Sequence, residues 1–233
     1  LDTGTGQSSD FGQAVSWQDA QISVAKPDDT YGALPTAGVI QKRDVLNLQS
    51  HALFSFHDVF GDTGYRIGPA DTINAAALWL YIPYAPSGTV SYSVYGLNAA
   101  DGDWSESQAS FNHKDQAGAL AWSGGVFGNS LTVSPYSSPA PPAGLGWYSI
   151  DVTDALRDYQ ANLIGGIALV SSSTPVSDIR NFYCATDEYD PASQAPGLYV
   201  DLTVVPEPRA MALYAGLGCL AWAVGRLSQQ RRG

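Results

Sequence analysis

The sequence predicts an all-β protein, an antiparallel jelly-roll β-sandwich with one short helix, followed by a C-terminal hydrophobic (transmembrane) helix. Three observations indicate this fold. Several segments alternate apolar and polar residues with the period of a β-strand. Clusters of Gly, Pro, Asn, Asp and Ser separate these segments, as in the proline-rich stretch 134–146. The chain is 45% hydrophobic and only 14% charged, which indicates a folded core and excludes a disordered polyelectrolyte.

The expected strands follow from the alternation. It is clearest in residues 89–97 and 197–205. Residues 76–82 are apolar on both faces, which is typical of a central strand. Further strands are expected at residues 45–48, 52–56, 146–151, 167–172 and 179–184. Many short strands joined by such turns favour a sandwich or jelly roll.

One helix is expected at residues 151–159, directly after a strand. Thr153 is the predicted N-cap, and Asp154 favours the positive end of the helix. Val152, Leu156 and Tyr159 share an apolar face. We expect this helix to cover one end or edge of the sandwich.

The domain organisation is simple. Residues 1–18 are rich in Gly, Ser and Gln and are expected to form a flexible N-terminal segment. Residues 19–205 are expected to form one sandwich domain, and residues 206–233 a separate C-terminal segment.

Within the C-terminal segment, residues 210–225 carry no formal charge, and Arg226, Arg231 and Arg232 follow. As a helix the uncharged stretch would be roughly 24 Å long, against about 30 Å for a hydrocarbon core. It can span a bilayer if the flanking residues snorkel. The positive-inside rule then keeps the arginines cytoplasmic and the sandwich outside. A buried core helix and a permanent anchor are the alternatives.

The residues before this stretch narrow the choice. Val205, Pro206, Glu207 and Pro208 are followed by the apolar span and then by arginines. This order closely resembles the PEP-CTERM sorting signal. The resemblance implies recognition by an exosortase, a membrane cysteine protease, in a Gram-negative envelope, and a link to exopolysaccharide or biofilm. Export requires an N-terminal leader. The first residues do not form one, so we expect a chain that is a fragment or already trimmed.

The charge of the chain restricts its partners. The net charge is −11, and four of the eleven basic residues follow Glu207. The rest is therefore strongly acidic, which argues against nucleic acid as a partner. Such a surface suits neutral sugars, or Ca²⁺ where several oxygens converge. We expect no intramolecular disulfide between Cys184 in the body and Cys219 in the apolar tail.

No catalytic residues are expected, and we interpret the protein as non-enzymatic. The sequence contains no Gly-x-Ser-x-Gly and no His-Glu-x-x-His. His51 and His57 have the same strand parity, but ordinary strand or surface histidines are expected rather than a metal pair, and the same holds for His113. Residues 104–107 are expected to form a turn anchored by a buried Trp104, in which Glu106 satisfies backbone donors.

Two acidic clusters are candidate Ca²⁺ sites, with solvated loop charges as the alternative. One is Asp28 with Asp29, and the other is Asp187 with Glu188 and Asp190.

Aromatic residues give a second kind of candidate site. Trp79, Tyr81 and Tyr84 run along one predicted strand. Aromatic rings stack on sugars, but they also fill cores. Core packing is the expected role of Trp79 and Tyr81, and glycan stacking is the alternative.

The ordered motifs resemble the DNRLRE domain, which is itself similar to disaggregatase-related and some carbohydrate-binding modules. The resemblance covers roughly residues 20–205. It is carried by residues 29–32, 53–56, 73–80, 104–107, 147–159, 166–170, 181–183 and 196–204. It implies a jelly roll on bacterial surface or secreted proteins, without a common catalytic site. We therefore expect an exported, non-catalytic surface or matrix protein that contacts polysaccharide. A structural spacer and a polysaccharide-active enzyme are the alternatives.

Overall fold

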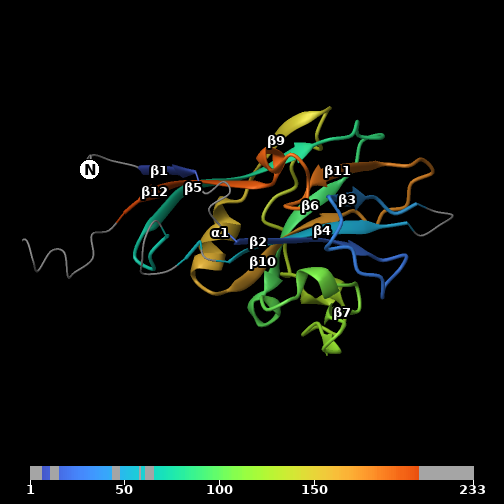
Figure 1. Ribbon diagram of the computed structural model, residues 1–233, viewed down its shortest axis with the longest axis horizontal. Helices are drawn as coiled ribbons and strands as arrows, with labels where there is room; N and C mark the ends of the chain where they lie inside the picture. The colour runs from blue at the N-terminus through green and yellow to red at the C-terminus, as the bar shows by residue number, and fades with distance from the viewer. Residues whose placement is uncertain (1–6, 11–15, 44–47, 58, 61–65, 205–233) are drawn as a thin grey trace, which may run out of the picture.

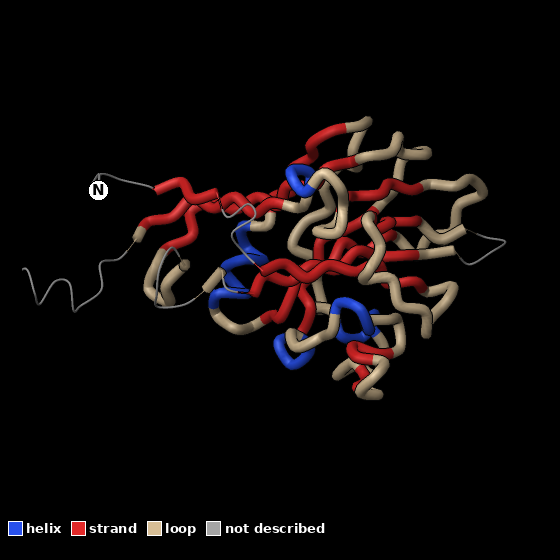
Figure 2. The backbone as a smooth tube through the Cα atoms, in the orientation of Figure 1, coloured by secondary structure: helices blue, strands red, loops and turns tan. Residues whose placement is uncertain are grey.

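A computed structural model describes residues 7–10, 16–43, 48–57, 59–60 and 66–204, which form two large antiparallel sheets packed face to face and a small two-stranded sheet (Figures 1 and 2). The first, here called the β5 sheet, has the spatial order β1 (Gln7–Asp10), β12 (Gly197–Thr203), β5 (Thr72–Ile82) and β9 (Gly146–Asp151). The second, called the β4 sheet, has the order β11 (Asn181–Ala185), β3 (Thr36–Ile40), β4 (Ser50–His57), β10 (Ile164–Ser171) and β6 (Tyr92–Asn98), and β2 (Ser16–Ser23) also pairs with β4. The prediction of an all-β antiparallel sandwich is confirmed.

The main core lies between the two sheets. Leu78 and Leu80 of β5 meet Phe54 of β4 and Leu169 of β10, and all four side chains are buried. These residues occupy alternate positions, as the pleat of a strand requires. Burial of each such side chain contributes about 1.5–3 kcal/mol. The two sheets are therefore held together mainly by apolar packing.

A second core lies on the opposite face of the β4 sheet. Trp104, Trp122 and Phe127 pack there over Leu53 and Ala168, and all five are buried. The three aromatic residues belong to the segment between β6 and β9. This segment contains η1 (Ala99–Asp101), η2 (Glu106–Gln108), β7 (His113–Asp115), β8 (Leu120–Ala121) and η3 (Phe127–Ser130). In Figure 1 it lies on the side of β2 and β10 that faces away from β5 and β12. The β4 sheet is thus covered on both faces.

The predicted helix is present as α1 (Thr153–Gln160), which contacts β5 and β10 and so covers an end of the core. Val152 and Leu156 are buried, and Tyr159 packs against the same core, as predicted. The prediction that Thr153 caps the helix is wrong. Its hydroxyl donates to Asp151 Oδ1 at 2.6 Å, and Asp151 Oδ1 also accepts from the Thr153 N–H at 2.9 Å. Asp151 therefore takes the acceptor role that was assigned to Thr153.

Five strands lie outside the predicted segments: β1, β2, β3, β7 (His113–Asp115) and β8 (Leu120–Ala121). In β2 the buried apolar residues are Ala20 and Ile22. Two apolar positions are too few to give a clear alternating pattern in the sequence. Part of the segment predicted as flexible is also ordered into strands. Gln7–Asp10 forms β1 against β12, and Ser16 begins β2. Of the strand predicted at residues 45–48, only Leu48 is described, and it lies outside any strand.

The expected turn at residues 104–107 is confirmed. Trp104 is buried, and Glu106 Oε1 accepts a hydrogen bond from the Asp19 backbone N–H at 2.9 Å.

Other predictions fall on residues that are not described. These are the sorting motif, the apolar span, Arg226, Arg231, Arg232 and Cys219. Within the described part of the chain, no helix has the length and apolar character needed to cross a membrane. Cys184 is a free, buried thiol whose Sγ donates to the Ala37 carbonyl oxygen, and burial raises its pKa.

Candidate functional site

The outer face of the β5 sheet carries exposed aromatic side chains on three neighbouring strands. Trp79 on β5 is 40% exposed, Trp147 on β9 is 48% exposed and Tyr199 on β12 is 39% exposed. In the strand register, Trp79 lies between Ser149 and Gly197. Because alternate residues of a strand point to opposite faces, the inward neighbours of these residues build the core while the aromatic rings face solvent.

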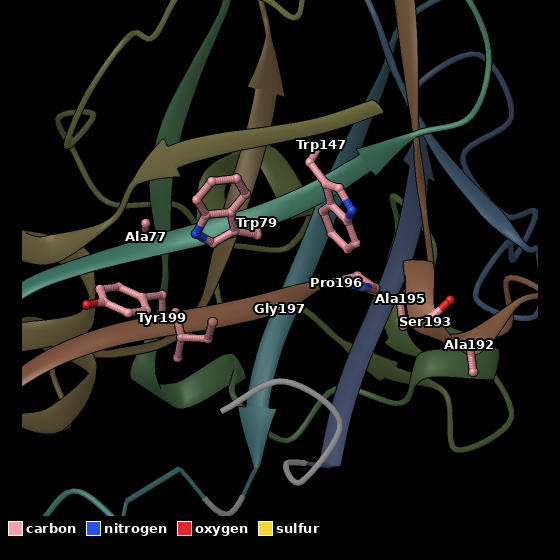
Figure 3. A pocket seen from close by; sticks show the side chains of 10 residues that line it. Ala77, Trp79, Trp147, Ala192, Ser193, Ala195, Pro196, Gly197 and Tyr199 are labelled. Atoms are coloured by element: carbon pink, nitrogen blue, oxygen red, sulfur yellow. The ribbon is translucent and has the colours of Figure 1, made fainter. Parts of the chain in front are cut away.

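A groove of about 750 Å³ runs along this face (Figure 3). The rings of Trp79 and Trp147 stand along one side. Tyr199 lies toward one end, and Ala192, Ser193 and Ala195 lie toward the other, across from Trp147. The groove is lined by Ala77, Trp79, Trp147, Ala192, Ser193, Ala195, Pro196, Gly197, Leu198 and Tyr199. None of these residues is charged. Small residues at the base, such as Ala77 and Gly197, leave the faces of the larger rings accessible.

Gly197 contributes directly to the open space beside Trp79. A Cβ at this position would meet only the Trp79 Cβ, at 3.8 Å, which is an ordinary contact. The backbone therefore tolerates a side chain here. Gly197 is the first residue of β12, and because it has no side chain the base of the groove stays low beside Trp79.

Of the three aromatic residues predicted as candidates for glycan stacking, only Trp79 lines the groove. Trp79 lies in the groove, so its expected role in core packing is wrong. Tyr81 is half-buried and contacts the Trp147 ring edge-on, with ring centroids 5.5 Å apart. Tyr84 lies outside the groove lining, 54% exposed, and packs against Tyr183. Trp147 and Tyr199 were missed, although their alternation with Ile150 and Val200 would have placed them on the outer face.

The histidines that the structure describes are not arranged for catalysis. His51 is buried and stacks on Phe127, and its Nδ1 accepts from the Ser171 N–H at 3.2 Å. Burial lowers its pKa to about 4, so the ring is neutral at ordinary pH. His113 Nδ1 lies 3.8 Å from Asp28 Oδ1 near the surface. The side chain of His57 is outside the described set.

A group of four carboxylates lies on another part of the surface. Asp19, Glu106, Asp187 and Glu188 each place an oxygen within 4.8 Å of an oxygen from the others. Of the predicted acidic residues, only Asp187 and Glu188 belong to it. Asp29 pairs with Lys26 at 3.2 Å, and Asp28 accepts from Asn112 at 2.8 Å.

Burial raises the pKa of three of these carboxylates, those of Asp19, Glu106 and Glu188. Burial, and then the charges of Asp187 and Glu188, raise the pKa of Asp19 well above its ordinary value. Burial raises the pKa of Glu106, and burial together with the neighbouring Asp187 carboxyl raises the pKa of Glu188. All three shifts reflect a site in which negative charge is incompletely compensated.

Asp19 and Glu106 are the members of this group that sequence reasoning missed. They lie 87 residues apart, and Asp187 is 168 residues from Asp19. Asp190, which was predicted with Asp187 and Glu188, does not belong to the group.

Comparison with protein-family models and with curated protein sequences finds no match for this chain.

Proposed function

We propose that this chain is an exported, non-catalytic protein of the cell surface or extracellular matrix that contacts polysaccharide through the Trp79–Trp147 groove. The observation that carries the proposal is the pair of exposed indole rings on neighbouring strands, above a base of small residues. Exposed apolar surface of this kind marks an interaction site in a folded protein. Aromatic rings offer flat apolar faces to the C–H faces of sugar rings.

The lack of charged residues in the groove indicates the class of polysaccharide. The ten lining residues are uncharged, and the chain as a whole carries a net charge of −11. An uncharged groove on an acidic protein favours neutral polysaccharide over anionic polymers, because an anionic chain would be repelled by the surrounding surface. The predicted jelly roll and the DNRLRE resemblance favour polysaccharide as the class of ligand.

The location is proposed from the C-terminal segment. Residues 205–208, the apolar span and the terminal arginines support sorting by an exosortase, with the membrane as a transient partner before processing in a Gram-negative envelope. Replacement of Pro206, Glu207 and Pro208 by alanine is expected to block processing in an exosortase-bearing host. An unchanged mature size on immunoblots would contradict this part of the proposal.

The groove is tested by binding to an array of neutral and acidic polysaccharides, followed by titration of the strongest ligand. Trp147→Ala is expected to weaken binding roughly 5- to 10-fold, because an aromatic contact contributes about 1–1.5 kcal/mol. Tyr84→Ala is the matched control, since Tyr84 is an exposed aromatic residue outside the groove. Absence of binding to every glycan at high protein concentration would instead favour the structural spacer. Turnover of a polysaccharide that one carboxylate substitution abolishes would favour an enzyme.

A further inference from the structure

Three segments that are distant in the sequence meet at the Asp19 carboxylate. Asp19 lies on β2, Glu106 begins η2, and Asp187 and Glu188 form the turn after β11. Two hydrogen bonds fix their relative positions. The Asp187 N–H donates to Asp19 Oδ2 at 3.1 Å, and the Asp19 N–H donates to Glu106 Oε1 at 2.9 Å. The backbone thus holds the carboxylates together despite their like charge.

Asp19 is incompletely satisfied in this arrangement. Its side chain is 0% exposed, and within the described residues its Oδ1 has no hydrogen-bond partner. Burial of a carboxylate oxygen without a partner is costly. No ion pair between any of the four carboxylates and a basic side chain occurs in the described part of the chain. The position lacks a positive charge that would offset the burial.

From this geometry we propose that Asp19, Glu106, Asp187 and Glu188 bind a Ca²⁺ ion. Ca²⁺ takes 6–8 oxygen ligands at about 2.3–2.6 Å, so two oxygens of one shell are at most about 5 Å apart. The carboxylate oxygens lie within 4.8 Å of one another and satisfy this limit. All four donors are oxygens, which excludes the nitrogen and sulfur set that zinc prefers. Asp187 and Glu188 are exposed, so water can complete the shell on their side.

The ion is assigned as Ca²⁺ rather than Mg²⁺ because of the donor set. Mg²⁺ demands near-ideal octahedral geometry and keeps several waters, and it is usually held by one or two carboxylates. Four carboxylates from three separate segments suit the flexible, higher coordination of Ca²⁺.

Ca²⁺ at this position would join three parts of the fold. Asp19 belongs to the β4 sheet, Glu106 belongs to the segment that covers this sheet, and Asp187 and Glu188 begin the loop that leads to residues 192–196 of the groove. The same loop carries Tyr189, whose ring lies 6.4 Å from that of Tyr81. The proposed ion would therefore fix the start of the loop that leads to this part of the groove, but its assignment does not depend on what the groove binds.

The test is thermal unfolding of the purified chain, followed by circular dichroism in EDTA, CaCl₂ or MgCl₂. CaCl₂ at about one hundred times its Kd is expected to raise the Tm by about 5–10 °C. Asp19→Asn should abolish this shift while keeping the acceptor for the Asp187 N–H. Glu188→Gln, at an exposed position, should reduce the shift without affecting folding. Asp190→Asn is the matched control, because Asp190 lies in the same loop outside the cluster, and it should keep the full shift.

Three results would overturn the proposal. The first is an unchanged Tm of the unsubstituted chain at about 10 mM CaCl₂, which would mean that protons shared among the carboxylates satisfy the site. The second is a shift of full size in Asp19→Asn, which would place the ion elsewhere. The third is an equal shift with MgCl₂, which would contradict the assignment to Ca²⁺. None of these results bears on glycan binding, so failure here and failure of the proposed function are distinguishable.

Discussion

Tryptophan side chains are buried at the outer face of the β4 sheet and exposed at the outer face of the β5 sheet. On the β4 sheet, Trp104 and Trp122 belong to the covering segment between β6 and β9 and are each only 2% exposed, because they pack down onto the sheet. On the β5 sheet, Trp79 and Trp147 remain 40% and 48% exposed. The same residue type therefore serves packing on one face and stays available on the other. Within the described residues a covering segment lies over one face only. The tryptophans of that segment are buried against the β4 sheet, whereas the tryptophans on the outer face of the β5 sheet stay exposed.

The comparison predicts unequal costs for removing a tryptophan from each face. Trp122→Ala is expected to lower the free energy of unfolding by about 3–5 kcal/mol, because it leaves a cavity and removes the donor to the Ser110 carbonyl oxygen. Trp147→Ala should cost less than about 1 kcal/mol. Urea denaturation measures both. Equal losses would show that the two faces are not differently covered.

The free energy of unfolding should fall in acid because of His51, which is buried at the covered face of the β4 sheet. The folded-state pKa of His51 is about 4, against about 6.5 for an ordinary histidine. Between these values the unfolded chain binds the additional proton, so stability falls as the pH drops. The penalty is absent above about pH 7 and reaches about 3 kcal/mol near pH 4.

Substitution of His51 isolates this contribution from that of the carboxylates. His51→Gln should reduce the loss of stability between pH 7 and pH 4, as measured by denaturation at a series of pH values. An identical pH dependence in the variant would show that His51 does not titrate as its burial requires.

On the open face, filling the groove should affect binding and leave stability nearly unchanged. Gly197→Val places a side chain beside Trp79 in space that the backbone leaves free. We expect a roughly 10-fold loss of glycan affinity, equivalent to about 1.4 kcal/mol. Gly144→Val is a matched control, because a Cβ at Gly144 meets nothing within 4 Å and this glycine is outside the groove. Similar losses in the two variants would contradict the assignment of the groove.

The smallest expected effect is that of Ca²⁺ removal on glycan affinity. Removal of Ca²⁺ with EDTA should weaken glycan binding about 2- to 5-fold, because the loop that carries residues 192–196 loses its tether. In the Asp19→Asn variant, the glycan affinity measured by calorimetric titration should be the same with and without EDTA. If the glycan affinity of the unsubstituted chain did not depend on Ca²⁺, the groove would not be linked to the proposed Ca²⁺ site.

Local patterns in the sequence predicted much of the sandwich. Regular alternation predicted β6 and β12, and a run that is apolar on both faces predicted β5. The apolar face of α1 was equally clear. The role of Trp79 could not be predicted in the same way. A strand that is apolar on both faces is central in its sheet, as β5 is, but its sequence does not say whether another segment covers its outer face.

The acidic cluster was only half predictable for a related reason. Asp187 and Glu188 are adjacent in the sequence and were recognised as a candidate Ca²⁺ site. Asp19 and Glu106 reach them only through the pairing of β2 with β4 and the folding of the segment after β6. Long-range register sets these contacts, and the isolated pattern around Asp19 contains no sign of it.

The central claim, that Trp79 and Trp147 form the polysaccharide contact, is tested most directly by acrylamide quenching of tryptophan fluorescence with and without saturating glycan. Trp104 and Trp122 are buried and serve as an internal reference that acrylamide quenches little. Glycan should protect the emission of the unsubstituted chain from quenching, and the double variant Trp79→Ala/Trp147→Ala should show no protection. Protection that persists in the double variant would place the glycan elsewhere and contradict the account.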